Sequence, residues 1–144
     1  MDQEVKREII MENYLHPHNK DFNDNKDYIH VNSNNESCID NIDLYILIKD
    51  DIIADIKFNG EACAISTSST SIMIKELIGK NIREAVEFIK NFFDMLNEKT
   101  YDEKTLGMAM VYDDLYKQKN RKNCALLPYK GIIKALDEYE RKKS

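Results

Sequence analysis

The chain has 144 residues, of which 42% are hydrophobic and 33% charged, with a formal net charge of −5. This length can bury a hydrophobic core, and we expect a single domain over residues 1–144. The acidic balance argues against nucleic acid as a partner, because phosphate binding needs a basic face. No apolar run approaches the roughly 18 residues of a membrane span, so we expect no membrane partner either.

The N-terminal third predicts a helix, a polar loop and a short strand. Residues 4 to about 15 carry apolar side chains at helical spacing, and Pro17 follows as a stop. This charged, periodic start is typical of a helix and not of a signal peptide, so we expect a cytoplasmic location. An Asn-rich loop follows, with a short strand at YIHV.

Two β-rich runs, residues 43–49 and 52–58, predict an antiparallel hairpin around the sequence KDD. Alternation in the second run places four side chains on one face: Ile52, Ala54, Ile56 and Phe58. Asn59 and Gly60 predict the end of this strand.

Helical periodicity dominates the rest of the chain. One helix begins at Cys63 and ends at Gly79, and a second follows a capping box formed by Asn81 and Glu84. Residues 100–118 predict one or two short helices, and residues 123–143 a final helix with Pro128 at its first position or one turn in. The prediction is an α+β fold with a small antiparallel three-stranded sheet and helices packed on one face.

The three cysteines lie at the ends of predicted elements. Cys38 precedes the first long strand, Cys63 lies between a strand and a helix, and Cys124 lies just before or within the first turn of the last helix. A helix start lowers the pKa of a thiol and favours the thiolate. An odd number of cysteines without a secretory signal argues against a disulfide framework. The thiols are therefore either buried apolar side chains or groups that react or bind a metal.

Asp40 could join the thiols as a metal ligand. It follows Cys38 by two residues, so both side chains point to the same side of an extended strand. Three thiolates and a carboxylate suit tetrahedral zinc or a platform for iron and sulfide. Without a C-x-x-C pair, spacing alone favours three incidental core cysteines. A Cys-His dyad is a further alternative, but the three histidines lie in the N-terminal third with nothing local that ties them to a thiol.

Four sequence segments in a fixed order identify a protein family more specifically than the spacing of the cysteines does. They are MENYLHPHNK with Tyr14, Pro17 and Asn19, ESCID with Cys38 and Asp40, FNGEACAISTSSTSIM with Cys63, and RKNCALLPYK with Cys124. Together they resemble the iron–sulfur assembly proteins of the NifU N-terminal, IscU and SufU type, along nearly the whole chain. Asn123, where IscU scaffolds carry histidine, and Arg121, which matches a SufU arginine, favour the SufU branch. So does the segment TYDEKTLGMAMVYDDLYKQKN, which occupies the place of a SufU insertion.

The resemblance implies the NifU and IscU fold and a Zn²⁺ ion bound by Cys38, Asp40, Cys63 and Cys124. It also implies a partner, a cysteine desulfurase of the SufS type that delivers persulfide sulfur. Our hypothesis is a sulfurtransferase-like relay in which Cys124 accepts the sulfur, for a downstream iron–sulfur scaffold or apo acceptor protein. Ile39 stands where the family has glycine, so we expect the loop that holds Cys38 and Asp40 to take a different shape.

Three alternatives to the relay remain open from the sequence. The same four ligands could build a [2Fe–2S] cluster on a true scaffold. The chain could also bind a desulfurase without metal, or be a metal-free structural domain with inert thiols.

Overall fold

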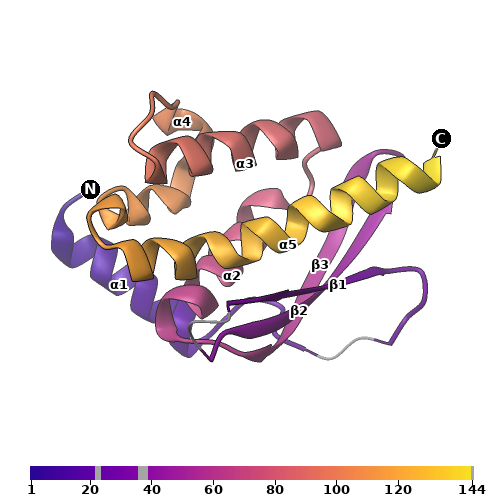
Figure 1. The fold of residues 1–144 in the computed structure, drawn as a ribbon, viewed down its shortest axis with the longest axis horizontal. Helices are drawn as coiled ribbons and strands as arrows, with labels where there is room; N and C mark the ends of the chain where they lie inside the picture. Colours follow the sequence, from indigo (N-terminus) through magenta and orange to yellow (C-terminus); the bar gives the residue numbers. More distant parts are fainter. Residues whose placement is uncertain (22–23, 36–38, 144) are drawn as a thin grey trace.

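The structure, a computed structural model, describes residues 1–21, 24–35 and 39–143. Its helices and strands follow the order shown in Figure 1. The strands are β1 (Ile29–Asn34), β2 (Asn41–Lys49) and β3 (Ile52–Glu61), and the α-helices are α1 (Gln3–Leu15), α2 (Ala64–Leu77), α3 (Ile82–Leu96), α4 (Glu103–Leu106) and α5 (Lys119–Lys143). Two 3₁₀ segments, η1 (Gly107–Tyr112) and η2 (Leu115–Lys117), join α4 to α5, so residues 100–118 are short helices as predicted.

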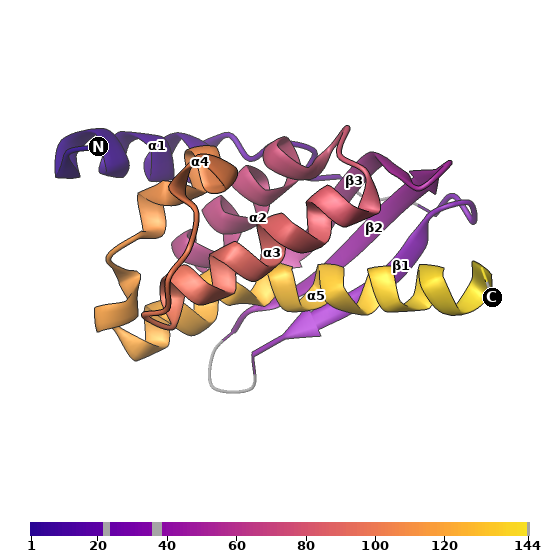
Figure 2. The same ribbon diagram turned by 90° about the horizontal axis from the view of Figure 1, so that it is seen from above.

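The three strands form one antiparallel sheet in the order β1-β2-β3, with β2 in the centre. The long helix α5 packs on β1 and β2 and also contacts α2, which contacts β3 and α1. Figure 2 shows α5 running beside the strands, with α2 and α3 stacked next to it. Because the helices cover one face of the sheet, the predicted α+β architecture is confirmed.

The predicted face of the second hairpin strand is wrong in its first half. Ile53, Ile56 and Phe58 are buried, whereas Ile52 and Ala54 are exposed. Leu47 pairs with Asp55 but Ile48 pairs with Ile53, so Ala54 is an extra residue in β3. Such a β-bulge inverts the alternation of side chains on either side of it, and alternation alone does not reveal it.

Asn59 and Gly60 do not end the strand, because β3 continues to Glu61. Gly60 has φ of +120°, and an added Cβ would lie 2.3 Å from the carbonyl oxygen of Asn41. Glycine is therefore required here by both the backbone conformation and the close approach of β2. Its lack of a side chain lets the β2–β3 ladder run to the pair Asn41 and Glu61, next to Asp40 and Cys63.

The helix signals of the sequence are confirmed for α2 and α3. Asn81 and Glu84 form the predicted capping box of α3, and Gly79, with φ of +93°, lies just beyond the end of α2. The last helix begins earlier than predicted, at Lys119, because lysine and arginine continue a helix well and the N–H of Lys122 already bonds the carbonyl of Gln118. Pro128 consequently lies deep inside α5, in neither of its two predicted positions.

The core lies between the sheet and the helices. Its largest side chains include Phe88 and Phe92 from α3, Tyr129 from α5 and Phe58 from β3, all fully buried or nearly so. The ring centroids of Phe92 and Tyr129 are 3.9 Å apart in a stacked arrangement. Across the described residues, none of the helices combines the length and apolar character that crossing a membrane requires.

We expect Gly60→Ala to lower the free energy of unfolding by at least about 2 kcal/mol, because it adds backbone strain to a collision with the Asn41 carbonyl. Gly79→Ala is the matched control. Gly79 also has positive φ, but nothing lies within 4 Å of its added Cβ, so it should cost only about 1 kcal/mol. Urea unfolding measures both, and equal losses would contradict the proposed close approach.

Candidate metal centre

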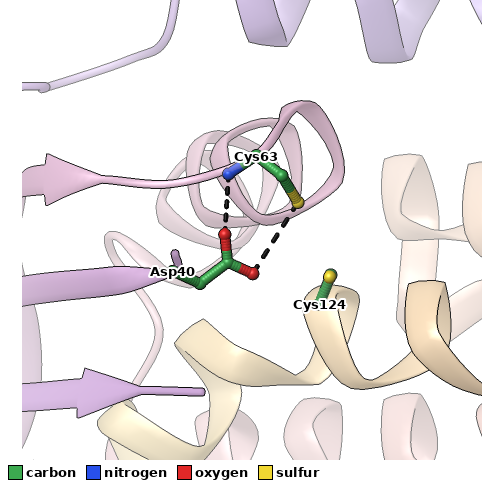
Figure 3. A group of neighbouring side chains, drawn as sticks. All are labelled: Asp40, Cys63 and Cys124. Atoms are coloured by element: carbon green, nitrogen blue, oxygen red, sulfur yellow. Dashed lines mark hydrogen bonds between the residues drawn. The ribbon is translucent and has the colours of Figure 1, made fainter. Parts of the chain in front are cut away.

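The register of the hairpin brings Asp40 and Cys63 together. Asn41, the first residue of β2, pairs with Glu61, the last residue of β3. Asp40 and Cys63 therefore leave the same end of the ladder. The backbone N–H of Cys63 donates to Oδ1 of Asp40 at 2.7 Å, and the Cys63 thiol lies 3.7 Å from Oδ2 (Figure 3).

Cys63 is the N-cap of α2, as its place between strand and helix predicted. Its backbone is extended, with φ of −67° and ψ of 173°, and its Sγ accepts the N–H of Ser66 at 3.4 Å. A thiolate gains at this position from unpaired N–H groups and from the positive end of the helix dipole. The helix start thus fixes the direction in which the sulfur points.

The Asp40 carboxylate is buried, with 1% of the residue exposed, yet it is well supplied with donors. Burial raises its pKa, but the hydrogen bonds from the Ser66 hydroxyl and the Cys63 N–H, with the two thiols, outweigh burial and hold the pKa below its ordinary value. Its Oδ1 accepts the Cys63 N–H, and its Oδ2 accepts the Ser66 hydroxyl at 2.6 Å. Asp40 is therefore an ionised oxygen donor at neutral pH.

Cys124 reaches the same point from the opposite side. It lies in the second turn of α5, so the prediction that it lies just before or within the first turn of the last helix is wrong. The helix dipole therefore does not act on it as on an N-terminal residue. The residue is only 8% exposed, and burial, with the neighbouring Cys63 and Asp40, raises the pKa of its thiol. Figure 3 shows its sulfur pointing toward Asp40 and Cys63.

Asp40, Cys63 and Cys124 form a group whose donor atoms all lie within 4.8 Å of one another. Two sulfur ligands of tetrahedral zinc lie about 3.8 Å apart, so shifts of roughly 1 Å would bring the donors to that spacing. Thiolates and carboxylates are also ligand types that zinc prefers. The carboxylate of Asp40 is almost fully buried, with 1% of the residue exposed. The three side chains therefore fit a metal ion.

The remaining predicted ligand, Cys38, lies outside the described residues. Its neighbour Ile39 is 69% exposed, so the isoleucine that replaces the family glycine points away from the core. Asp40 still reaches Cys63 and Ser66 with full hydrogen bonding. Ile39 therefore does not displace the carboxylate from Cys63 and Cys124.

The histidines do not join this group. His30 bonds Asp43 through Nε2 at 2.9 Å and stacks on Tyr45 at the sheet surface, and His16 and His18 are exposed. The described structure therefore gives no support to a Cys-His dyad.

Two other residues singled out in the sequence, Asn19 and Arg121, lie outside the metal centre. Asn19 has φ of +57° and its side chain donates to the carbonyl of Ile56 at 3.0 Å, which ties the segment after α1 to β3. Arg121 is exposed in the first turn of α5.

Each of the six consecutive hydroxyl residues of α2, from Ser66 to Ser71, makes a side-chain hydrogen bond. All six are buried, and their partners lie on α1, α5, η1, α2 itself and the segments just before β2 and α2. Ser66 contributes directly to the site through Asp40. Its place three residues after Cys63, on the same face of the helix, is the sequence signal that could have identified it.

Comparison with known proteins agrees with this geometry. Residues 5–144 match the NifU-like N terminal domain. A zinc-dependent sulfurtransferase SufU of Bacillus subtilis is 37% identical over 135 residues, covering 93% of this chain and 90% of that protein. An iron–sulfur cluster assembly scaffold protein IscU of Thermotoga maritima is 32% identical over 107 residues, covering 74% of this chain and 75% of that protein.

Solved structures show the same fold. The crystal structure of a putative iron–sulfur cluster assembly scaffold protein for the SUF system from Fervidobacterium islandicum superposes with a TM-score of 0.85 at 37% identity, covering 90% of this chain and 94% of that one. A NifU-like N-terminal protein from Brucella abortus gives a TM-score of 0.85 at 17% identity, covering 98% and 99%, which shows likeness of fold alone. The chain belongs to the NifU-like N-terminal domain family, as the four sequence segments indicated.

Proposed function

We propose that this protein works in iron–sulfur cluster assembly as a sulfur-transfer protein that accepts persulfide sulfur from a cysteine desulfurase of the SufS type. The observation that carries the proposal is the convergence of Asp40, Cys63 and Cys124 in one buried group. The SufU relative, named as a zinc-dependent sulfurtransferase, supports this choice because it matches more of the chain, at higher identity, than the IscU relative does.

In this proposal Cys38, Asp40, Cys63 and Cys124 hold one zinc ion. When bound, zinc keeps the thiols deprotonated and protected from oxidation. The buried carboxylate supplies the hard ligand, and its hydrogen bonds to Cys63 and Ser66 fix its orientation before any metal arrives.

Cys124 is the proposed acceptor. Its thiolate attacks the terminal sulfur of the desulfurase persulfide, the S–S bond of that persulfide breaks, and a new S–S bond forms on Cys124. The desulfurase cysteine leaves as a thiolate, and the proton on the terminal sulfur stays with that sulfur on Cys124, so no external oxidant or reductant is consumed. Because Cys124 is only 8% exposed, the partner must open the site to reach it. The sulfur then passes to an iron–sulfur scaffold or apo acceptor protein.

Metal analysis of the protein purified without added metal tests the site. We expect about one zinc per chain, and loss of most of it in Cys63→Ala because a tetrahedral site loses a ligand. His30→Ala is the control, since His30 could bind zinc chemically but lies with Asp43 outside the group. A metal-free protein with three freely reacting thiols would overturn the zinc site.

Mass spectrometry after incubation with the desulfurase and cysteine tests the acceptor. We expect the mass of one added sulfur atom on the peptide that contains Cys124, and none on that peptide in Cys124→Ser. The variants Cys38→Ser and Cys63→Ser should keep the label on Cys124. A label on another cysteine while Cys124 stays unmodified would reassign the acceptor and leave the zinc site standing.

Anaerobic incubation with iron and sulfide separates relay from scaffold. We expect no stable [2Fe–2S] chromophore in the zinc-loaded protein, because its thiolates are already engaged. A scaffold would instead form a cluster that survives gel filtration and passes to an apo acceptor. That result would contradict the sulfur relay and support the scaffold function.

A further inference from the structure

Pro128 leaves one carbonyl of α5 without its helical partner. In an α-helix the carbonyl of residue 124 accepts the N–H of residue 128, and proline has no N–H. Its ring also pushes against the carbonyl four residues earlier. The affected residue is Cys124, one of the three members of the described metal centre.

Ser66 occupies the vacant position. Its Oγ lies 3.1 Å from the Cys124 carbonyl oxygen and 2.6 Å from Oδ2 of Asp40, and the residue has no exposed surface. The Cys63 thiol lies 3.5 Å from the same Oγ. One hydroxyl on α2 therefore contacts all three residues of the centre, which come from three different parts of the chain.

Oδ2 is the oxygen of Asp40 that faces the sulfur atoms. Figure 3 shows it turned toward the thiols of Cys63 and Cys124, whereas Oδ1 accepts the Cys63 backbone N–H. Because Ser66 donates to Oδ2, it acts on the atom that would bind the metal. The Cys124 carbonyl holds the hydroxyl from the other side, so its single hydrogen is shared between two acceptors in fixed positions.

We propose that Ser66 is a positioning residue of the metal centre, held between the Cys124 carbonyl that Pro128 leaves open and the Asp40 carboxylate that it orients. This inference rests on the proposed metal site and adds the residue that aligns it. Hydrogen-bonded partners of metal ligands contribute about 10–100-fold to metal affinity. Ser66 contributes to metal binding through the carboxylate, and Pro128 contributes through the carbonyl.

The chain supplies a matched control in Ser69. Its Oγ donates to the carbonyl of Ala125 at 2.7 Å, so it joins the same two helices as Ser66 and is equally buried. Among the hydrogen bonds of the described residues, Ser69 has none with Asp40. Pro128 does not free the Ala125 carbonyl, whose helical donor is Tyr129.

The first experiment measures zinc affinity by competition with a chelator in the wild type, Ser66→Ala and Ser69→Ala. We expect zinc binding to weaken about 10–100-fold in Ser66→Ala and to change less than about threefold in Ser69→Ala. Equal affinities in wild type and Ser66→Ala would overturn the positioning role while leaving the metal site intact. Absence of zinc binding in the wild type would instead overturn the proposed metal site itself, and the inference with it.

Thermal unfolding of the metal-free proteins tests the role of Pro128. Ser66→Ala leaves the Cys124 carbonyl without a donor, and adding Pro128→Ala supplies a helical N–H. We expect Pro128→Ala to raise Tm by about 5 °C more in the Ser66→Ala background than in the Ser69→Ala background. The same gain in both backgrounds would show that Pro128 and Ser66 act independently.

The double variant also protects the test against a folding defect. If Ser66→Ala does not fold, Ser66→Ala with Pro128→Ala has its carbonyl satisfied and can be measured for zinc. Its affinity should stay about 10–100-fold below that of Pro128→Ala, because Oδ2 of Asp40 still lacks its donor. Recovery of zinc affinity along with Tm would reduce Ser66 to a purely structural residue.

Discussion

The buried carboxylate of Asp40 is the constraint on which the site depends. An ionised group at 1% exposure is tolerated only when its oxygens are hydrogen-bonded, and here one oxygen takes the Cys63 N–H and the other the Ser66 hydroxyl. These two bonds join the start of β2, the junction after β3 and the first turn of α2. The two donors also keep the pKa of Asp40 low, so the charge that a metal needs is present without one.

The helix α5 lies on the other side of the site from Asp40 and Cys63. Hydroxyl groups of neighbouring elements bond its carbonyls near Pro128 and so fix its position. Ser66 and Ser69 on α2 donate to Cys124 and Ala125, and Ser33 on β1 donates to Leu127 at 2.8 Å. Pro128 removes the helical donor of the Cys124 carbonyl alone, and Ser66 supplies a replacement. Three hydroxyl donors thus position the thiol of Cys124 against the sheet and α2 together.

The sequence allowed prediction of the fold class, and its resemblance to a family named the three residues that the structure brings together, Asp40, Cys63 and Cys124. Local signals such as the capping box of α3 or the Cys63 junction depend on neighbours within four residues, so they can be read directly. The bulge at Ala54 depends on how β3 pairs with β2. The start of α5 depends on whether several charged residues adopt a helix or a loop. Neither has a local signature. The prediction that Cys63 and Cys124 lie together came from resemblance to a family. The 60 residues between them are too many for sequence spacing alone to predict a contact.

Burial protects the Cys124 thiol from solvent but also keeps a reaction partner from reaching it. The charges in the first turn of α5 influence how easily this end of the helix opens. Lys119, Arg121 and Lys122 occupy the first turn of the helix, which has no acidic residue, although the chain as a whole carries a net charge of −5. Cations at a helix N-terminus oppose the helix dipole, so this turn gains less from helix formation than the turns that follow. Cys124 lies in the next turn, where Ser66 of α2 bonds its carbonyl. Opening of this first turn would therefore cost less free energy than opening the part of α5 where Tyr129 stacks on Phe92 of α3.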